Sequence, residues 1–229
     1  MATATRKTNW FAIWVSVAVV AVLVAVVVIV AVLNTRASDP TADLGAVPTA
    51  SGIDRESGAI TFGDGPDTVA TYVDFMCPYC GQFEEAEGET IAGLIDDGSI
   101  TLQVHPVSIL DRLSQGTEYS SRAASAMYAV AEADPDNAYA FFVSLYDKQP
   151  AEQTPGLTDE ELVQLAKDAG VDVTADLEKA ILDHEYLDFA KAQELPEGAT
   201  GTPTLMVNDE IVPVTYDPQA DIVANLTAQ

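Results

Sequence analysis

The sequence of 229 residues predicts an α/β domain that follows a single N-terminal membrane-spanning helix. Three observations support this organisation. Residues 10–33 form an uninterrupted apolar run, residues 69–73 are rich in β-branched and aromatic side chains, and residues 82–95 carry apolar side chains at helical spacing. Because a strand followed by a helix is the basic unit of α/β domains, we expect a sheet covered by helices.

The apolar run at 10–33 is long enough to cross a bilayer as an α-helix, and it carries no charged side chain. A signal peptide has a shorter apolar region that ends in a small-residue cleavage site. Here the run ends instead in Asn34, Thr35 and Arg36. The sequence therefore predicts a retained membrane anchor.

The charges around this run predict its orientation. Arg6 and Lys7 precede it, which by the positive-inside rule keeps residues 1–9 in the cytoplasm and the rest of the chain outside. Residues 34–56 are rich in Ser, Thr, Asp, Gly, Pro and Ala and show no apolar periodicity, which predicts a flexible linker. The folded domain would then lie in a compartment where disulfides form and persist.

The chain is strongly acidic. It has 36 Asp and Glu against 10 Lys and Arg, with a formal net charge of −26. This charge argues against nucleic acid as a partner, because the phosphate backbone would be repelled. The acidic residues are spread without long blocks of like charge, which indicates a solvated surface; adaptation to high salt is the alternative.

The segment Cys77-Pro78-Tyr79-Cys80 contains both cysteines of the chain. Two intervening residues place the sulfurs within disulfide reach when the second cysteine lies in the first turn of a helix. Pro78 suits the first helical position, which makes Cys77 the N-cap, close to free backbone N–H groups. Those donors favour a thiolate. We therefore expect Cys77 to be the exposed nucleophile and Cys80 to be more buried and to resolve mixed disulfides.

Two other uses of the cysteines are possible. A structural zinc site needs two further ligands at short spacing, whereas the only histidines are His105 and His184, far apart in the sequence. A cysteine protease would pair Cys77 with one of them and would leave Cys80 without a role. The spacing favours redox chemistry over both, so we expect neither a metal nor a cofactor.

Beyond the motif, the sequence predicts one strand, a helical stretch, a β-hairpin and a closing helix. Residues 100–104 alternate polar and apolar side chains, as a strand does. Thr158 begins a capping box, with Gly170 as the stop signal of that helix. The predicted helices span 118–132, 138–146, 158–169, 177–192 and 217–226, and the hairpin pairs 204–207 with 211–214.

Two distant segments carry a family resemblance. They read Asp-Phe-Met-Cys-Pro-Tyr-Cys at 74–80 and Gly-Thr-Pro-Thr-Leu-Met-Val-Asn at 201–208. Together they resemble the DsbA-like branch of the thioredoxin superfamily, from Gly58 to the C-terminus. The resemblance implies a thioredoxin-like fold with an inserted helical subdomain. Residues 57–110 and 196–229 would form the thioredoxin-like domain, and 111–195 the insertion.

The resemblance also implies a second part of the active site. Thr202 would lie beside the two sulfurs and tune their reactivity, and Pro203 would follow a cis peptide bond. The neighbouring backbone would bind an extended substrate as an added strand. One position departs from the family pattern, since Thr71 stands where many members have a buried acid. Asp74 is the nearest acid, and we interpret it as a surface or capping carboxylate.

The activity implied is thiol–disulfide exchange through Cys77 and Cys80. The leading hypothesis is an oxidase that introduces disulfides into cysteine-containing exported proteins. A membrane protein of the DsbB or vitamin K epoxide reductase type would reoxidise it. Two alternatives stay open: a reductase or isomerase for particular clients, such as those of cytochrome c maturation, and a binding module without turnover. No dimerisation segment is evident, so we expect a monomer.

Overall fold

The computed structural model describes residues 45–227. The predicted cytoplasmic segment 1–9 and membrane span 10–33 lie outside these residues, as does the first part of the predicted linker 34–56. Within the described part of the chain, no helix combines the length and the apolar character that a membrane crossing requires.

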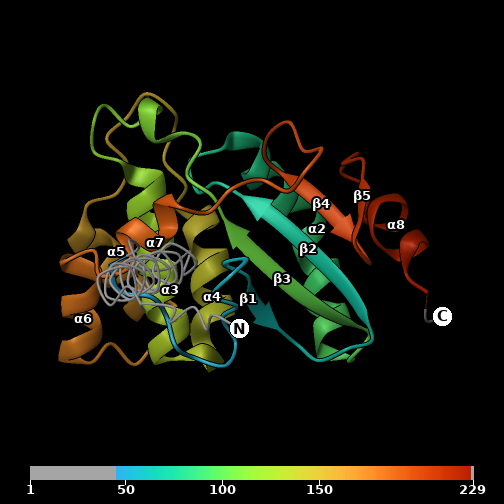
Figure 1. The fold of residues 1–229 in the computed structure, drawn as a ribbon, viewed down its shortest axis with the longest axis horizontal. Helices are drawn as coiled ribbons and strands as arrows, with labels where there is room; N and C mark the ends of the chain where they lie inside the picture. Colours follow the sequence, from blue (N-terminus) through green and yellow to red (C-terminus); the bar gives the residue numbers. More distant parts are fainter. Residues whose placement is uncertain (1–44, 228–229) are drawn as a thin grey trace, which may run out of the picture. The chain divides into compact units, whose positions relative to one another are not determined.

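A five-stranded sheet forms the centre of the domain (Figure 1). Its spatial order is β1-β3-β2-β4-β5, with β2 and β3 parallel and the other pairs antiparallel. The central strand β2 is therefore paired on both edges. The strands are β1 (Ile60–Phe62), β2 (Asp67–Val73), β3 (Ile100–Pro106), β4 (Thr204–Val207) and β5 (Glu210–Val212).

One long helix, α2 (Pro78–Asp96), directly follows β2. A group of five helices is inserted between β3 and β4, as the resemblance implies, and it gathers to one side of the sheet in Figure 1. The last elements of the described residues are a short helix and a 3₁₀ turn. The inserted helices are α3 (Tyr119–Ala133), α4 (Pro135–Asp147), α5 (Asp159–Asp168), α6 (Ala175–Leu182) and α7 (Leu187–Lys191), and the last helix is α8 (Pro218–Asp221).

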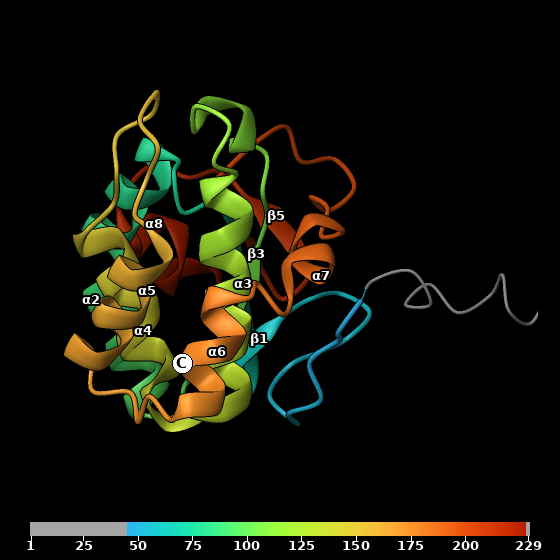
Figure 2. The same cartoon turned by 90° about the vertical axis from the view of Figure 1, so that its left-hand side faces the viewer.

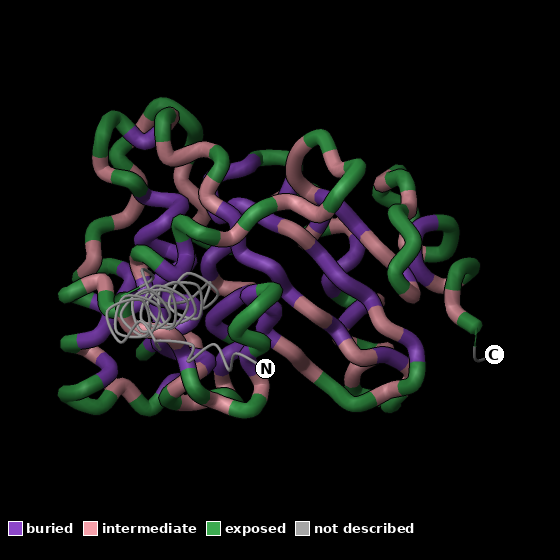
Figure 3. The backbone as a smooth tube through the Cα atoms, in the orientation of Figure 1, coloured by how far each residue is buried: buried purple, intermediate pink, exposed green. Residues whose placement is uncertain are grey.

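The insertion is built around α3. In Figure 2 this helix lies between α4 and α5 on one side and α7 on the other, and it is buried over almost its whole length. Its alanine and serine side chains are small, so neighbouring helices can approach closely. The Tyr128 hydroxyl donates to the carbonyl oxygen of Gly58 at 2.8 Å, which attaches α3 to the segment before the sheet. Burial is continuous from α3 into β2 and β3 (Figure 3).

The end of the predicted linker contacts this core. The backbone N–H groups of Thr49 and Ala50 donate to the Glu132 carboxylate at 2.7 and 2.6 Å. Ile53 is buried and bridges to Ile60. Residues 49–53 are thus attached to the folded domain by α3 and by β1, a strand that the sequence analysis did not identify.

The helix predicted at 177–192 is wrong, because the structure forms two helices there, α6 and α7. The break is at His184, whose φ is 55°. The N–H of His184 donates to the Ile181 carbonyl and that of Glu185 to the Ala180 carbonyl, which together form a Schellman motif. A glycine usually holds the left-handed position of this motif, as Gly170 does after α5, so histidine gave no stop signal.

The closing helix predicted at 217–226 is also interrupted. It consists of α8 and a 3₁₀ turn at Val223–Asn225, joined through Ile222, which is fully buried. The Asp221 carboxylate accepts hydrogen bonds from Thr215 and from the Tyr216 N–H, so it turns back toward the hairpin. These tertiary contacts hold the last turn out of regular α-helical geometry.

Candidate active site

The redox motif lies at the junction between β2 and α2. Cys77 is the N-cap of α2 and has extended backbone, with φ −74° and ψ 114°, and Pro78 occupies the start of the helix, as predicted. The Cys77 N–H donates to the Asp74 carbonyl at 3.0 Å, and the Cys80 N–H donates to the Cys77 carbonyl at 2.9 Å. Both sulfurs are free thiols in this structure.

The prediction of an exposed nucleophile is wrong. Cys77 is only 4% exposed and Cys80 1%, so the predicted order of burial holds but the difference is small. The loop before β4 covers the first sulfur, and Cys77 Sγ donates to the carbonyl oxygen of Thr202 at 3.4 Å. The exposed residue of the motif is Tyr79, at 59%.

The two thiols differ strongly in acidity. The pKa of Cys77 is lowered from 9.0 to about 6, first by a hydrogen bond from the Cys80 thiol, then by the Thr202 hydroxyl and by the N–H groups of Cys80 and Tyr79, while burial opposes them. Burial and the neighbouring Cys77 sulfur raise the pKa of Cys80 well above its usual value. At neutral pH, Cys77 is therefore a thiolate and Cys80 a thiol. The sequence analysis predicted the helix donors but not the leading part of Cys80.

Thr202 lies against the redox pair, and the peptide bond that joins it to Pro203 is cis. The Thr202 carbonyl oxygen can accept a hydrogen bond from Cys77 only while Cys77 is a thiol. When Cys77 ionises, that bond is lost. The buried Thr202 hydroxyl, which has no partner among the described residues, is then the donor available to the thiolate.

Asp74 is not a surface carboxylate, the first of our two interpretations, but its hydrogen bonds to backbone N–H groups agree with the second, a capping carboxylate. It is fully buried, and its carboxylate accepts hydrogen bonds from the N–H groups of Met76 and Leu110 and from the Ser120 hydroxyl. Burial raises its pKa to about 6, against the effect of these donors. Thr71 is buried in β2, so Asp74 is the buried acid next to the motif in this chain.

Gln149, just after α4, was not identified from the sequence. Its Nε2 donates to the carbonyl oxygens of Cys77 and Phe75 at 2.9 and 3.3 Å. An alanine at position 81 would displace this amide, because its Cβ would lie 2.4 Å from Gln149 Oε1. A glycine in the first turn of a helix is a signal of such a close approach, but it does not identify the partner.

The two histidines lie away from the sulfurs. His105 Nδ1 is 3.1 Å from the Ser57 carbonyl oxygen, and its ring stacks on Tyr72. His184 Nε2 is 2.9 Å from an Asp159 carboxylate oxygen in the insertion. A zinc site or a cysteine protease would require a histidine beside Cys77. These contacts hold both histidines elsewhere.

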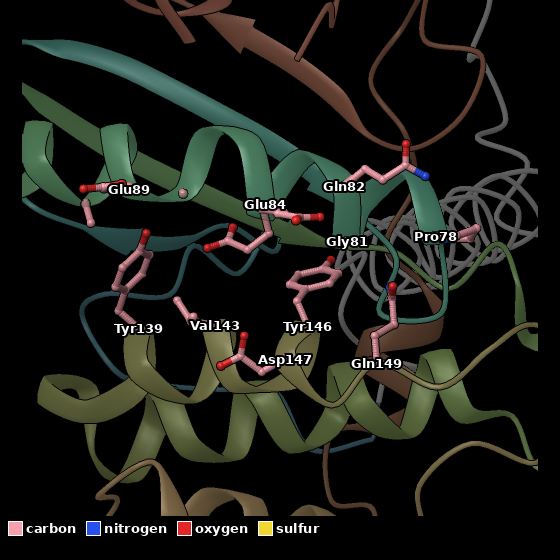
Figure 4. A pocket seen from close by; sticks show the side chains of 13 residues that line it. Pro78, Gly81, Gln82, Glu84, Glu89, Tyr139, Val143, Tyr146, Asp147 and Gln149 are labelled. Atoms are coloured by element: carbon pink, nitrogen blue, oxygen red, sulfur yellow. The ribbon is translucent and has the colours of Figure 1, made fainter. Parts of the chain in front are cut away.

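A groove of about 740 Å³ runs between α2 and α4 and begins beside the redox pair (Figure 4). At one end it is lined by Pro78, Gly81 and Gln149. Further along α2 it is lined by Glu84 and Glu89, which face Tyr139, Tyr146 and Asp147 on α4.

Comparison with known proteins shows which proteins share this fold. A family model described as Thioredoxin matches residues 59–224. The oxidized DsbA of Mycobacterium tuberculosis is 30% identical, with a TM-score of 0.62 over 69% of this chain and 86% of that chain. The reduced disulfide bond oxidoreductase DsbG of the same organism is 31% identical, with a TM-score of 0.64 over 78% of this chain and 83% of that one. The MdbA thiol-disulfide oxidoreductase of Actinomyces oris shares the fold at 23% identity, with a TM-score of 0.62 over 82% of this chain and 95% of that one.

A further match is to a part of a much larger protein. The serine/threonine-protein kinase PknE of Mycobacterium tuberculosis is 33% identical over 114 residues, which are 48% of this chain. The match spans only 20% of the kinase. The match therefore indicates that the kinase contains a segment related to part of this chain, and it gives no reason to assign kinase activity to this chain.

The matched range covers the sheet, the inserted helices and the redox motif. Two solved relatives of at least 30% identity, each covered over more than two thirds of its length, are thiol-disulfide oxidoreductases of the Dsb type. The fold is accordingly thioredoxin-like with an inserted helical part. The chain belongs to the thioredoxin superfamily, as a DsbA-like thiol-disulfide oxidoreductase with Cys77 and Cys80 as its redox pair.

Proposed function

We propose that the protein is a membrane-anchored oxidase that introduces disulfide bonds into exported proteins outside the cytoplasm. The main support for oxidation rather than reduction of the substrate is the pKa of Cys77, which is lowered to about 6. A thiolate that is stable at neutral pH stabilises the reduced pair relative to its disulfide. It is also a good leaving group. Both effects favour transfer of a disulfide from the protein to its substrate.

The reaction begins with the pair oxidised. A substrate thiolate attacks Cys77 Sγ, the bond between Cys77 and Cys80 breaks, and Cys80 leaves and takes up a proton. A second substrate thiol loses its proton to water and attacks the substrate sulfur of the mixed disulfide, so that Cys77 leaves as a thiolate. The substrate has lost two electrons to the pair, and one disulfide has been exchanged for another.

Two features support binding of an extended polypeptide at this site. The Thr202–Pro203 loop covers Cys77 and would pair its backbone with the substrate as an added strand. Pro78 and Tyr79 are exposed next to the sulfurs and offer an apolar surface. The substrate must displace or slide along the loop, because the sulfur of Cys77 is covered in the free protein.

The location and the partners follow from the sequence. Residues 10–33 would anchor the domain, with residues 1–9 in the cytoplasm and the part of 34–56 before Thr49 as linker. A quinone-linked membrane protein of the DsbB or vitamin K epoxide reductase type would take the two electrons and restore the disulfide. One solved protein with this fold, from Salmonella enterica serovar Typhimurium, is described as periplasmic, at 19% identity and a TM-score of 0.53 over 78% of this chain and 95% of that one.

The direction can be tested by trapping the redox state in intact cells with an alkylating reagent after acid quenching. We expect Cys77 and Cys80 to be mostly oxidised at steady state and to become reduced when disulfide-forming client proteins are overproduced. A pair that is mostly reduced at steady state would contradict the oxidase and favour a reductase or isomerase. A Cys80→Ser variant that accumulates no mixed disulfides, together with absence of dithiol-oxidase activity, would favour a binding module.

A further inference from the structure

The groove between α2 and α4 is lined by acidic side chains and tyrosine hydroxyls, without a basic side chain among its lining residues. Four carboxylates and two phenols line it, and among its lining residues there is no lysine, arginine or histidine. Apolar contact is available as well, from Ala92 and Val143 and from the faces of the tyrosine rings. The carboxylates and phenols are Glu84, Glu85, Glu89, Asp147, Tyr139 and Tyr146.

Glu84 is held inside the groove rather than in solvent. Its carboxylate folds back over Gly88, where an added Cβ would lie 2.5 Å from Glu84 Oε1. Burial and the charge of Asp147 raise its pKa to about 7. Neither Glu84 nor Asp147 forms an ion pair with a described residue, so no described cation balances the two carboxyl groups across the groove.

The hydroxyl of Tyr146 independently indicates that the groove binds a hydrogen-bonding group, because it has no hydrogen-bond partner among the described residues. Tyr146 lines the groove from α4, is directed toward α2 (Figure 4) and is only 8% exposed. A buried hydroxyl without a partner costs free energy, about 1–3 kcal/mol in proteins generally. Burial, together with the charges of Cys80, Asp74 and Glu84, raises its pKa well above the usual value. Tyr146 also packs against Phe75, just before the redox motif, with 5.5 Å between the ring centroids, so it links the groove to the active-site loop.

We propose that this groove binds a lysine or arginine side chain of the polypeptide substrate, a few positions from the cysteine that reacts with Cys77. The inference rests on the proposed function, because it assumes a polypeptide disulfide substrate. A long basic side chain fits both kinds of lining. Its apolar stem packs against Val143 and the Tyr139 ring, and its charged end donates to Glu84 and Asp147. Tyr146 Oη is closed to solvent in the free protein, so it becomes a further acceptor only when binding displaces the atoms that cover it.

The spacing along the substrate follows from the helix. Glu84 lies seven positions after Cys77, which at the rise of an α-helix is roughly 10 Å. An extended chain advances about 3.3 Å per residue, so the basic residue is expected about three positions from the substrate cysteine. The groove begins at Gln149, which also binds the Cys77 carbonyl, so a peptide can reach it without leaving the active site.

The test measures oxidation of matched peptides by the oxidised full-length protein. Each reduced peptide carries the same two cysteines and differs only three positions from the first, where it has arginine, glutamine or glutamate. We expect a second-order rate constant about tenfold higher for the arginine peptide than for the glutamine peptide at low ionic strength. The glutamate peptide should be the slowest, and salt should reduce all differences.

The variants are compared by the ratio of arginine to glutamine rates within each protein. We expect the ratio to fall to about one in Glu84→Gln/Asp147→Asn and to persist in Glu56→Gln/Glu185→Gln, which removes two exposed carboxylates elsewhere. Gly88→Ala should lower the ratio without changing charge, because it displaces the Glu84 carboxylate. Gly93→Ala on the same helix meets no atom within 4 Å and should leave the ratio intact.

The possible failures are distinct. Equal rates for all three peptides with the wild-type protein would overturn the basic subsite and leave the proposed oxidase standing. An arginine preference that survives in Glu84→Gln/Asp147→Asn would overturn the assignment to this groove. If no peptide were oxidised by protein whose Cys77 alkylates normally after reduction, the proposed function itself would be contradicted.

Discussion

The side-chain amide of Gln149 donates a hydrogen bond to the carbonyl oxygen of Cys77, with 2.9 Å between the two atoms. Gln149 follows α4, in the insertion, whereas Cys77 ends the loop after β2. The same amide bonds to the Phe75 carbonyl oxygen at 3.3 Å. The inserted helices thus do more than cover the active site, because they fix the backbone on which the reactive sulfur is carried.

Gly81→Ala should disturb this contact. The new Cβ would lie 2.4 Å from Gln149 Oε1, so the amide must move and the carbonyls of Cys77 and Phe75 lose a donor. We expect the weakened hydrogen bonds, about 1–3 kcal/mol, to outweigh the gain in helix propensity of about 0.5–1 kcal/mol, so the free energy of unfolding falls and thiol exchange becomes slower. Urea unfolding and peptide oxidation measure the two effects.

Gly93→Ala is the matched control on the same helix. Its Cβ meets nothing within 4 Å, so only helix propensity changes, and we expect a gain of about 0.5–1 kcal/mol in the free energy of unfolding. Stabilisation by both substitutions would contradict the role assigned to Gln149.

The acidity of Cys77 can be measured through its rate of alkylation by iodoacetamide in the reduced protein. We expect a single pH transition near 6, with Cys80 unreactive over the same range. Cys80→Ala should raise the midpoint by about one to two units, because a hydrogen bond to a charged group contributes about 1.5–3 kcal/mol. An unchanged midpoint in Cys80→Ala would mean that the helix donors alone hold the thiolate.

The oxidised protein should be more stable in mild acid than at neutral pH. The pKa of Asp74 is raised from 3.8 to about 6, so between these values the native state binds more protons than the unfolded state. The free energy of unfolding must then fall as pH rises from about 4 to 7, by roughly 3 kcal/mol from Asp74. Glu84 and Glu87, both raised to about 7, act in the same direction. Urea titrations at several pH values measure the slope.

Asp74→Asn separates the contribution of this residue. The amide cannot accept from all three donors, so the variant should lose about 1–3 kcal/mol at pH 4. Its free energy of unfolding should then depend less on pH than that of the wild type. A slope identical to that of the wild type would show that Asp74 is not the group that titrates.

Reduction of the disulfide between Cys77 and Cys80 should partly reverse the fall in unfolding free energy with rising pH. The pKa of Cys77 is about 6 in the folded protein against 9.0 ordinarily, so its contribution to stability is present at high pH and is lost as pH falls through 6. The unfolding free energy of the reduced protein minus that of the oxidised protein should therefore increase from pH 6 to 8, because only the reduced protein gains stability from the Cys77 thiolate. Parallel unfolding of both forms measures it, and a constant difference would contradict a thiolate at Cys77.

Local signals in the sequence predicted the parts that depend on neighbouring residues. Pro78 after Cys77 predicted the N-cap, and Thr158 with Glu161 predicted a capping box that the structure forms. Alternation and β-branched residues predicted β2 and β3. These features hold because the backbone groups that they satisfy lie within one turn or one strand.

The remaining features depend on contacts between distant residues. Gln149 reaches Cys77 across 72 positions, and Asp74 is buried under Ser120, 46 positions away. His184 takes a left-handed conformation without being a glycine. The place of Thr202 and Pro203 came from resemblance to a family, since no periodicity or propensity at those positions indicates a partner for a sulfur.

The order of the strands sets when this enzyme becomes reactive during its own synthesis. The central strand β2 pairs with β4, and Cys77 meets Thr202 across 125 positions. A growing chain exposes Cys77 long before residues 202–207 exist, and until they do neither the covering loop nor the second edge of β2 can form. Cys77 then lacks the Thr202 hydroxyl, one of the donors that lower its pKa in the folded protein. Full stabilisation of the Cys77 thiolate therefore waits until residues near the end of the described chain have been added.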